Sequence, residues 1–162
     1  VKRSSKNFGV GLMDAVAIGS DCYRILPDAK GFKFHKIAGD EIGIKLMRIR
    51  NKKILRGKKI QLSFHDGRNM LVEKDDFKTG DVVIFDLQKN AIKDKISFAK
   101  GSVIFVVRGR SRGMTGRVEE ITVTKSPKPN EVLVDIGSAK IVLPTDYVFV
   151  IGKDKPVITV SE

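Results

Sequence analysis

The sequence of 162 residues has no tryptophan, a single cysteine and only two histidines. With Cys22 alone, neither an internal disulfide nor a cysteine-rich metal site can form, which fits a reducing compartment. No apolar run approaches the ~20 residues that a membrane-spanning helix needs. No amphipathic basic helix with a broad aromatic face is evident either. These absences exclude a disulfide scaffold and argue against a membrane partner.

The start of the chain also lacks two common features. There is no initial methionine, and Val1-Lys2-Arg3-Ser4-Ser5-Lys6 is basic but precedes no apolar stretch long enough for a signal peptide. We therefore expect no secretory leader, and we expect the chain to be a fragment of something longer.

Positive charge is what the sequence has in excess. Lysine and arginine number 31 against 19 acidic residues, a formal charge of +12. Residues 1–68 hold 16 basic and 6 acidic residues (net +10), and residues 69–162 hold 15 and 13 (net +2). Such a balance favours a polyanionic partner, and with membranes disfavoured that partner is nucleic acid.

The hydrophobic pattern is of the β type. Short apolar runs alternate with glycine, proline, aspartate and asparagine at close spacing, which is typical of small barrels or sandwiches. We expect one short helix at 38–45, a connector at 91–96 and a new unit near residue 97. The prediction is a mainly β chain of two small β-barrel-like domains, residues 1–96 and 97–162. Strand segments are expected at 10–18, 23–26, 32–37, 46–49, 58–64, 70–72, 82–87, 103–107, 117–123, 132–136, 141–143, 147–151 and 157–160. Residues 58–72 are expected to form a hairpin that turns at 65–69.

The densest basic segment spans residues 45–59, with eight cations and no acid. Its centre, from Arg50 to Lys59, is predicted to be a loop or a twisted hairpin. A merely solvated face would mix charges of both signs, so the segment favours RNA contact through neutralised phosphates. Its candidate residues are Lys45, Arg48, Arg50, Lys52, Lys53, Arg56, Lys58 and Lys59.

A second basic segment is rich in glycine: Val106-Val107-Arg108-Gly109-Arg110-Ser111-Arg112-Gly113-Met114-Thr115-Gly116-Arg117-Val118. Glycine permits tight turns, and guanidinium forks bind phosphate in a bidentate way. A plain β-turn is the alternative, but it has no need of four arginines. No Gly-Lys-Ser/Thr follows, so the segment is not a nucleotide P-loop. The candidate RNA contacts here are Arg108, Arg110, Arg112 and Arg117.

This second segment resembles a KOW motif, which occurs on SH3-like barrels in ribosomal proteins and transcription elongation factors. Five further motifs follow one another along the chain: Gly11-Leu12-Met13-Asp14, Tyr23-Arg24-Ile25-Leu26-Pro27-Asp28, His65-Asp66-Gly67-Arg68-Asn69, Phe77-Lys78-Thr79-Gly80-Asp81 and Asp146-Tyr147-Val148-Phe149-Val150-Ile151-Gly152. In this order they resemble the small-subunit ribosomal protein family S4e of archaea and eukaryotes, the archaeal type more closely. The resemblance implies a central β-rich domain followed by an SH3-like KOW barrel, both on small-subunit rRNA. It also implies an RNA-binding domain upstream, which we expect this chain to lack.

Other side chains that could carry chemistry are given simpler interpretations. His65-Asp66 lacks clustered partners for a metal, so we predict a turn, with Arg68 available to RNA. Ser63, His65 and Asp66 cannot form an oriented catalytic relay, because Asp66 falls in that turn. Phe32, Phe34 and Phe64 could stack on bases, but their strand spacing favours the core.

Taken together, the sequence predicts a structural constituent of the small ribosomal subunit, located in the cytoplasmic ribosome. Its partners would be rRNA and neighbouring ribosomal proteins, with no membrane, no metal, no cofactor and no catalytic residue. The alternative is a KOW-containing transcription or translation factor that binds a protein partner through an exposed apolar patch. An RNA-modifying enzyme needs a convergent pocket that no segment offers.

Overall fold

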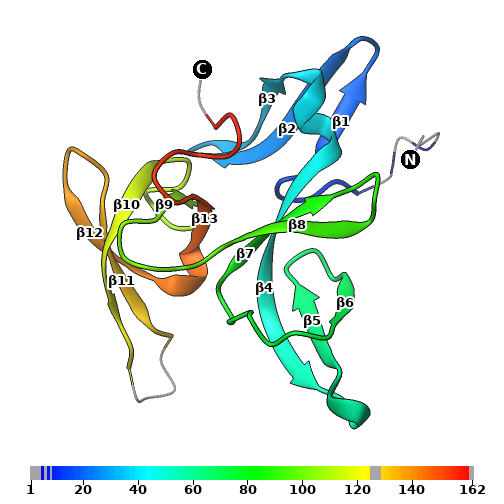
Figure 1. Cartoon of the computed structure of the whole chain (residues 1–162). Coiled ribbons are helices and arrows are strands. Elements are labelled where there is room, and N and C mark those ends of the chain that lie inside the picture. The colour runs from blue at the N-terminus through cyan, green and yellow to red at the C-terminus, as the bar shows by residue number, and fades with distance from the viewer. Residues whose placement is uncertain (1–4, 6, 8, 125–128, 161–162) are drawn as a thin grey trace.

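The computed structural model describes residues 5, 7, 9–124 and 129–160, which form three antiparallel sheets (Figure 1). The first sheet is a meander of β1 (Ala15–Ile18), β2 (Asp21–Asp28) and β3 (Gly31–Ile37). β2 pairs with both neighbours and runs through Pro27, which we expected to end the strand. This small sheet lies above the other two in Figure 1.

The second sheet has the order β6-β5-β4-β7-β8. Its long central strand, β4 (Ile44–Ile54), pairs with β5 (Ile60–Phe64) at its far end and with β7 (Val82–Asp86) at its near end. β6 (Asn69–Val72) and β8 (Ala91–Ile96) are the edges. The predicted hairpin across 58–72 is confirmed, whereas 91–96 is a paired strand and not a connector.

The third sheet has the order β12-β11-β10-β9-β13 and curls into a barrel-like unit. The chain passes from β9 (Val103–Val106) to β10 (Thr115–Thr122) through residues 107–114, which we call the glycine-arginine loop. β13 (Val148–Gly152) returns to pair with β9. β11 (Glu131–Asp135) and β12 (Lys140–Pro144) form the outer hairpin. The predicted strand at 157–160 does not form, although Ile158 and Val160 are buried.

Helical structure in the described part of the chain is limited to single 3-10 turns: η1 (Gly39–Gly43), η2 (Arg56–Lys58) and η3 (Thr145–Tyr147). The helix expected at 38–45 is therefore shorter than predicted. Asp40 and Glu41 do lie in its first turn, but Ile44 and Lys45 belong to β4. Two glycines in a five-residue turn disfavour a longer helix, and the pairing of β4 with β7 takes over.

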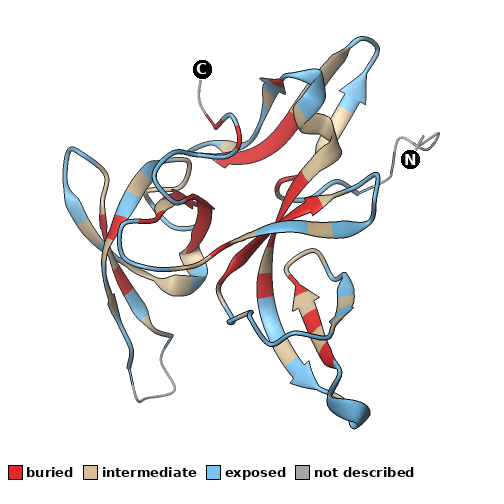
Figure 2. Ribbon diagram, in the orientation of Figure 1, coloured by how far each residue is buried: buried red, intermediate tan, exposed pale blue. Residues whose placement is uncertain are grey.

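The strands β4 and β7 are buried on both faces of their sheet where they pair, because consecutive residues of these strands enter different clusters. Leu46, Val82 and Ile84 pack in a first cluster with the barrel-like unit. Met47, Val83 and Phe85 pack in a second cluster with β5. Figure 2 shows this buried zone where β4 and β7 meet β13. The sheets change between β8 and β9, but the first cluster spans that change, so the domain boundary at 96/97 stays a prediction.

Candidate nucleic-acid interface

The tip of the β4–β5 hairpin is formed by residues 50–59, which hold six cations and no acidic residue, and we call this segment the basic arm. Its turn is closed by the amide of Leu55, which donates to the carbonyl of Lys59 at 2.8 Å. Gly57 at the tip has φ of 78°, a conformation that glycine adopts without strain. Figure 1 shows this tip projecting at the opposite end of the molecule from the β1–β3 sheet. The predicted hairpin is thus confirmed.

Most cations of the basic arm face solvent without a carboxylate. Five are exposed and make no ion pair with any residue that the structure describes: Arg50, Lys53, Arg56, Lys58 and Lys59. Lys52 differs, since its ammonium pairs with Asp75 and donates to the carbonyl of Phe77 at 3.1 Å. The arm therefore offers a line of uncompensated positive charge on a paired β scaffold.

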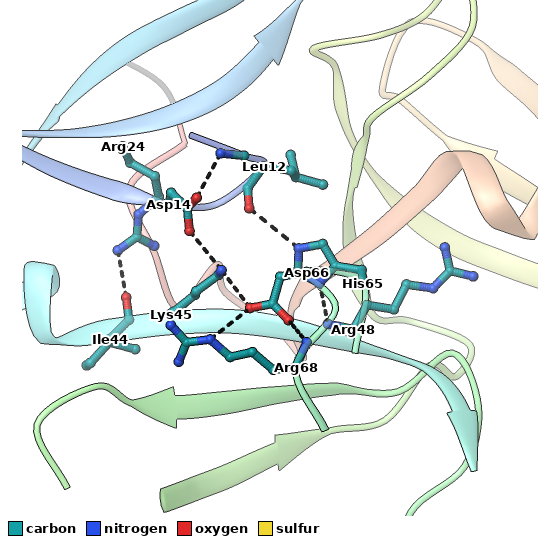
Figure 3. A network of polar contacts seen from close by, with 10 residues as sticks. Leu12, Asp14, Arg24, Ile44, Lys45, Arg48, His65, Asp66 and Arg68 are labelled. Carbon is teal, nitrogen blue, oxygen red and sulfur yellow. Dashed lines mark hydrogen bonds and ion pairs between the residues drawn. The ribbon is translucent and has the colours of Figure 1, made fainter. Parts of the chain in front are cut away.

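Lys45, predicted as an RNA contact, lies instead inside the molecule (Figure 3). Its ammonium lies 2.7 Å from Asp14 and 2.8 Å from Asp66, and its side chain is 6% exposed. Burial of a charge requires such pairing. Lys45 is therefore removed from the candidate contacts and joins the β1–β3 region to the β5–β6 turn.

Arg48 acts mainly as a link between the β4–β8 sheet and the barrel-like unit. Its guanidinium lies 3.2 Å from the Asp146 carboxylate and 3.4 Å from the carbonyls of Asp146 and Val148. Burial lowers the pKa of Arg48, the pair with Asp146 raises it, and the nearby charges of Arg50 and Arg108 lower it further. Three guanidinium groups from two sheets therefore gather at this junction.

The four arginines of the second basic segment, residues 106–118, have two different roles. Arg112 donates to the carbonyls of Asp28 and Ala29 at 2.7 and 3.0 Å, and Arg117 donates to the carbonyl of Asp154 at 2.9 Å. Arg108 and Arg110 are exposed and have no ion pair with the described residues. The first two brace the fold, and the second two remain available to a partner.

The His65-Asp66 turn is confirmed. The Asp66 carboxylate accepts the amide of Arg68 at 3.1 Å, and Gly67 has φ of 85°. The guanidinium of Arg68 lies 3.4 Å from the same carboxylate and 5.7 Å from the Phe85 ring, yet its side chain remains 49% exposed. Burial lowers the pKa of His65. In the described part of the chain no three His, Cys, Asp or Glu side chains gather as metal ligands would.

A groove of about 610 Å³ lies at the junction of the sheets, lined in part by Arg48, Arg50 and Arg108. Phe32 also lines it and is 69% exposed, while Phe34 is 56% exposed. The core interpretation was wrong for these two phenylalanines and is confirmed for Phe64, which is 3% exposed. Phe32 and Phe34 alternate with Lys33 and His35, which indicates a strand with one apolar and one polar face. This alternation does not tell whether another element covers the apolar face.

The family profile and the relatives reported below agree on the family that this chain resembles. The profile described as "Ribosomal family S4e" matches residues 20–92. "Small ribosomal subunit protein eS4" of Methanothermobacter thermautotrophicus is 42% identical over 161 residues, covering 97% of this chain and 66% of the relative. The protein of the same name from Pyrobaculum islandicum is 36% identical over 167 residues, covering 99% and 70%. The chain thus spans about two thirds of the length of these relatives.

The fold has a solved counterpart. The crystal structure of 30S ribosomal protein S4e from Thermoplasma acidophilum superposes with a TM-score of 0.81 at 27% identity, covering 92% of this chain and 76% of that one. Among the residues described here, no helix is both long and apolar enough to cross a membrane. The comparisons do not favour the alternative of a factor that binds a protein partner.

Proposed function

This chain belongs to ribosomal family S4e, and from that membership we propose that it is a structural constituent of the small ribosomal subunit that holds rRNA through basic surfaces. The observation that carries the proposal is the basic arm, where five exposed cations make no ion pair with any carboxylate in the described part of the chain. RNA phosphates repel one another, and cations that neutralise them release condensed counterions, which drives binding. Sequence-specific reading of bases is not required.

The proposed RNA contacts come from two elements, the basic arm and the glycine-arginine loop. Arg50 of the arm and Arg108 of the loop line one groove, so the two elements would contact rRNA together there, and the projecting tip of the arm would reach a second rRNA segment. Lys52 would contribute if RNA phosphate displaces Asp75, whereas Arg48, Arg112 and Arg117 would position the loops. The proposed contact set is Arg50, Lys53, Arg56, Lys58, Lys59, Arg68, Arg108 and Arg110.

The role proposed for the protein is mechanical, with no catalytic step. Neighbouring ribosomal proteins are its other proposed partners, and the cytoplasmic ribosome is its proposed location. A stiff scaffold suits this role, because cations held on paired strands lose less conformational freedom when they meet phosphate.

Salt dependence of RNA binding tests the proposal. The triple variant Lys53→Gln, Arg56→Gln, Lys59→Gln should weaken binding to small-subunit rRNA. It should also reduce the slope of log K against log salt by about 2 to 3, since each phosphate contact contributes roughly 0.7–0.9. The matched control neutralises three exposed lysines away from the arm: Lys89→Gln, Lys93→Gln and Lys155→Gln. An arm variant with the wild-type slope, or a control that loses as much, would refute the role of the arm.

A further inference from the structure

The outer face of the β1–β3 sheet exposes apolar side chains that folding leaves uncovered. Ile18, Phe32 and Phe34 are 59%, 69% and 56% exposed. Strand register places Phe34 opposite Ile25, and the Tyr23 ring meets the Phe34 ring edge-on at 6.3 Å. Large exposed aromatic groups on one sheet face mark a binding surface more often than chance exposure does.

The same sheet ends at the basic groove. Phe32 lines this groove of about 610 Å³ together with Arg50 and Arg108, which come from β4 and from the glycine-arginine loop. The lining carboxylates are already engaged internally: Asp14 and Asp66 with Lys45, and Asp146 with Arg48. Arg50 and Arg108 therefore face the groove without an acidic partner in the described chain, so the site favours an anion.

Three contacts fix the aromatic ring relative to the guanidinium groups. Arg112 donates to the carbonyls of Asp28 and Ala29 in the β2–β3 turn. Gly113 packs so closely that a Cβ there would lie 3.1 Å from the Asp28 carboxylate and 3.2 Å from its Cα. The Phe32 ring and the guanidinium groups are therefore held in place before a ligand binds. This lowers the entropic cost of binding a ligand that contacts both.

We infer that this groove binds one unpaired nucleotide of RNA, its base stacked on Phe32 and its phosphate held between Arg50 and Arg108. Every base has a face that stacks on an aromatic ring, and arginine forks match phosphate geometry. A protein partner would match the apolar face but not Arg50 and Arg108, which line the groove beside Phe32. The inference rests on the proposed function and adds single-stranded RNA as the ligand of this one site.

The test compares two RNA probes on the whole chain: an oligouridine of about eight nucleotides with one 2-aminopurine, and an RNA duplex of equal charge. Phe32→Leu should lower affinity for the single strand about tenfold, in line with the loss of one stacked base, and should abolish quenching of the 2-aminopurine. Duplex affinity should change less than about twofold, because the arm is intact. Phe32→Tyr should restore both single-strand readouts, and Leu71→Ala, which truncates an exposed side chain of β6, should change neither.

Several outcomes would overturn the inference. Unchanged single-strand affinity and quenching in Phe32→Leu would show that no base stacks there. Equal losses on both probes would point to a general effect on the fold, which a lowered melting temperature would reveal. If Phe32→Leu binds both RNA probes as the wild type does but binds a purified ribosomal protein more weakly, the outer face of the β1–β3 sheet contacts a protein partner instead. In each case an arm variant that still flattens the salt dependence would leave the proposed function standing.

Discussion

At the scale of single residues, the polar network around Lys45 shows how cations in one segment come to have different roles. Lys45 and Lys53 are both on β4, but Lys45 pairs across to Phe85 in the middle of the sheet, while Lys53 lies beyond the end of β7. The first must be neutralised by Asp14 and Asp66, and the second can stay in water. Position along the strand therefore decides which cations are available to RNA.

Replacement of Lys45 by methionine should destabilise the protein by about 3 kcal/mol, because it leaves two carboxylates without their buried partner. The control is Lys52→Met, which breaks an exposed pair with Asp75 and should cost less than about 1 kcal/mol. Urea unfolding of both variants measures the difference. Equal costs would contradict the structural role given to Lys45.

His65 should make stability depend on pH in mildly acidic solution. Its ring accepts the amide of Arg48 at Nδ1, meets the Phe149 ring edge-on at 5.3 Å, and has a pKa lowered from 6.5, chiefly by burial. The unfolded chain therefore binds a proton more readily, so the unfolding free energy should fall as pH drops below about 6.5. Urea titrations between pH 7 and pH 5 measure this slope, and His65→Gln should flatten it. A slope that persists in the variant would assign the dependence to other groups.

At the scale of elements, Gly116 in β10 shows why a glycine is required just after the glycine-arginine loop. A Cβ on Gly116 would lie 2.6 Å from the carbonyl oxygen of Asp135 and 2.7 Å from a methyl group of Val134, on the neighbouring strand β11. Backbone cannot move aside as a flexible side chain can. The close approach of β10 and β11 therefore leaves room only for glycine at position 116. The same packing holds the neighbouring Arg117 in place.

Gly116→Ala should consequently destabilise the protein by about 2 kcal/mol, within the usual range for overpacking a filled site. Gly39→Ala is the matched control, because a Cβ at Gly39 meets nothing within 4 Å. Thermal unfolding of the two variants compares them directly. If the melting temperatures of the two variants fall by the same amount, the close approach of β10 and β11 is not the reason that position 116 requires glycine.

The elements themselves were largely predictable from the sequence, because each depends on local alternation and turn residues. The hairpin over 58–72 and the His65-Asp66 turn follow from such signals. The misses depend on distant pairing. Residues 91–96 form a strand by pairing with β7, and Phe32 stays exposed on the outer face of β3, which no element of the described chain covers. Likewise, the burial of Lys45 depends on Asp14 and Asp66, 31 and 21 residues away.

At the scale of the whole molecule, the two predicted units share one core. Leu46 and Val82 of the β4–β8 sheet lie in the same cluster as Ile104 and Phe149 of the barrel-like unit. Arg48 adds polar contacts across the same junction. The described chain should therefore unfold as one cooperative body, even though its sheets are separate.

Leu46→Ala tests this coupling. Truncation of this fully buried side chain should lower stability by about 2–5 kcal/mol. Native-state hydrogen exchange should show reduced protection in β9 and β13 as well as in β4 and β7, because one cluster joins them. Loss of protection confined to β4 and β7 would show that the two units fold independently.

If the exposed cations of the basic arm hold rRNA, they should lie against it in the intact small ribosomal subunit. Ultraviolet cross-linking in intact subunits, followed by mass spectrometry of the linked peptides, measures this contact. We expect RNA cross-links at Lys53, Lys58 and Lys59 and none at the buried Lys45. Cross-links on Lys89 and Lys93 with none in the arm would contradict this role of the arm.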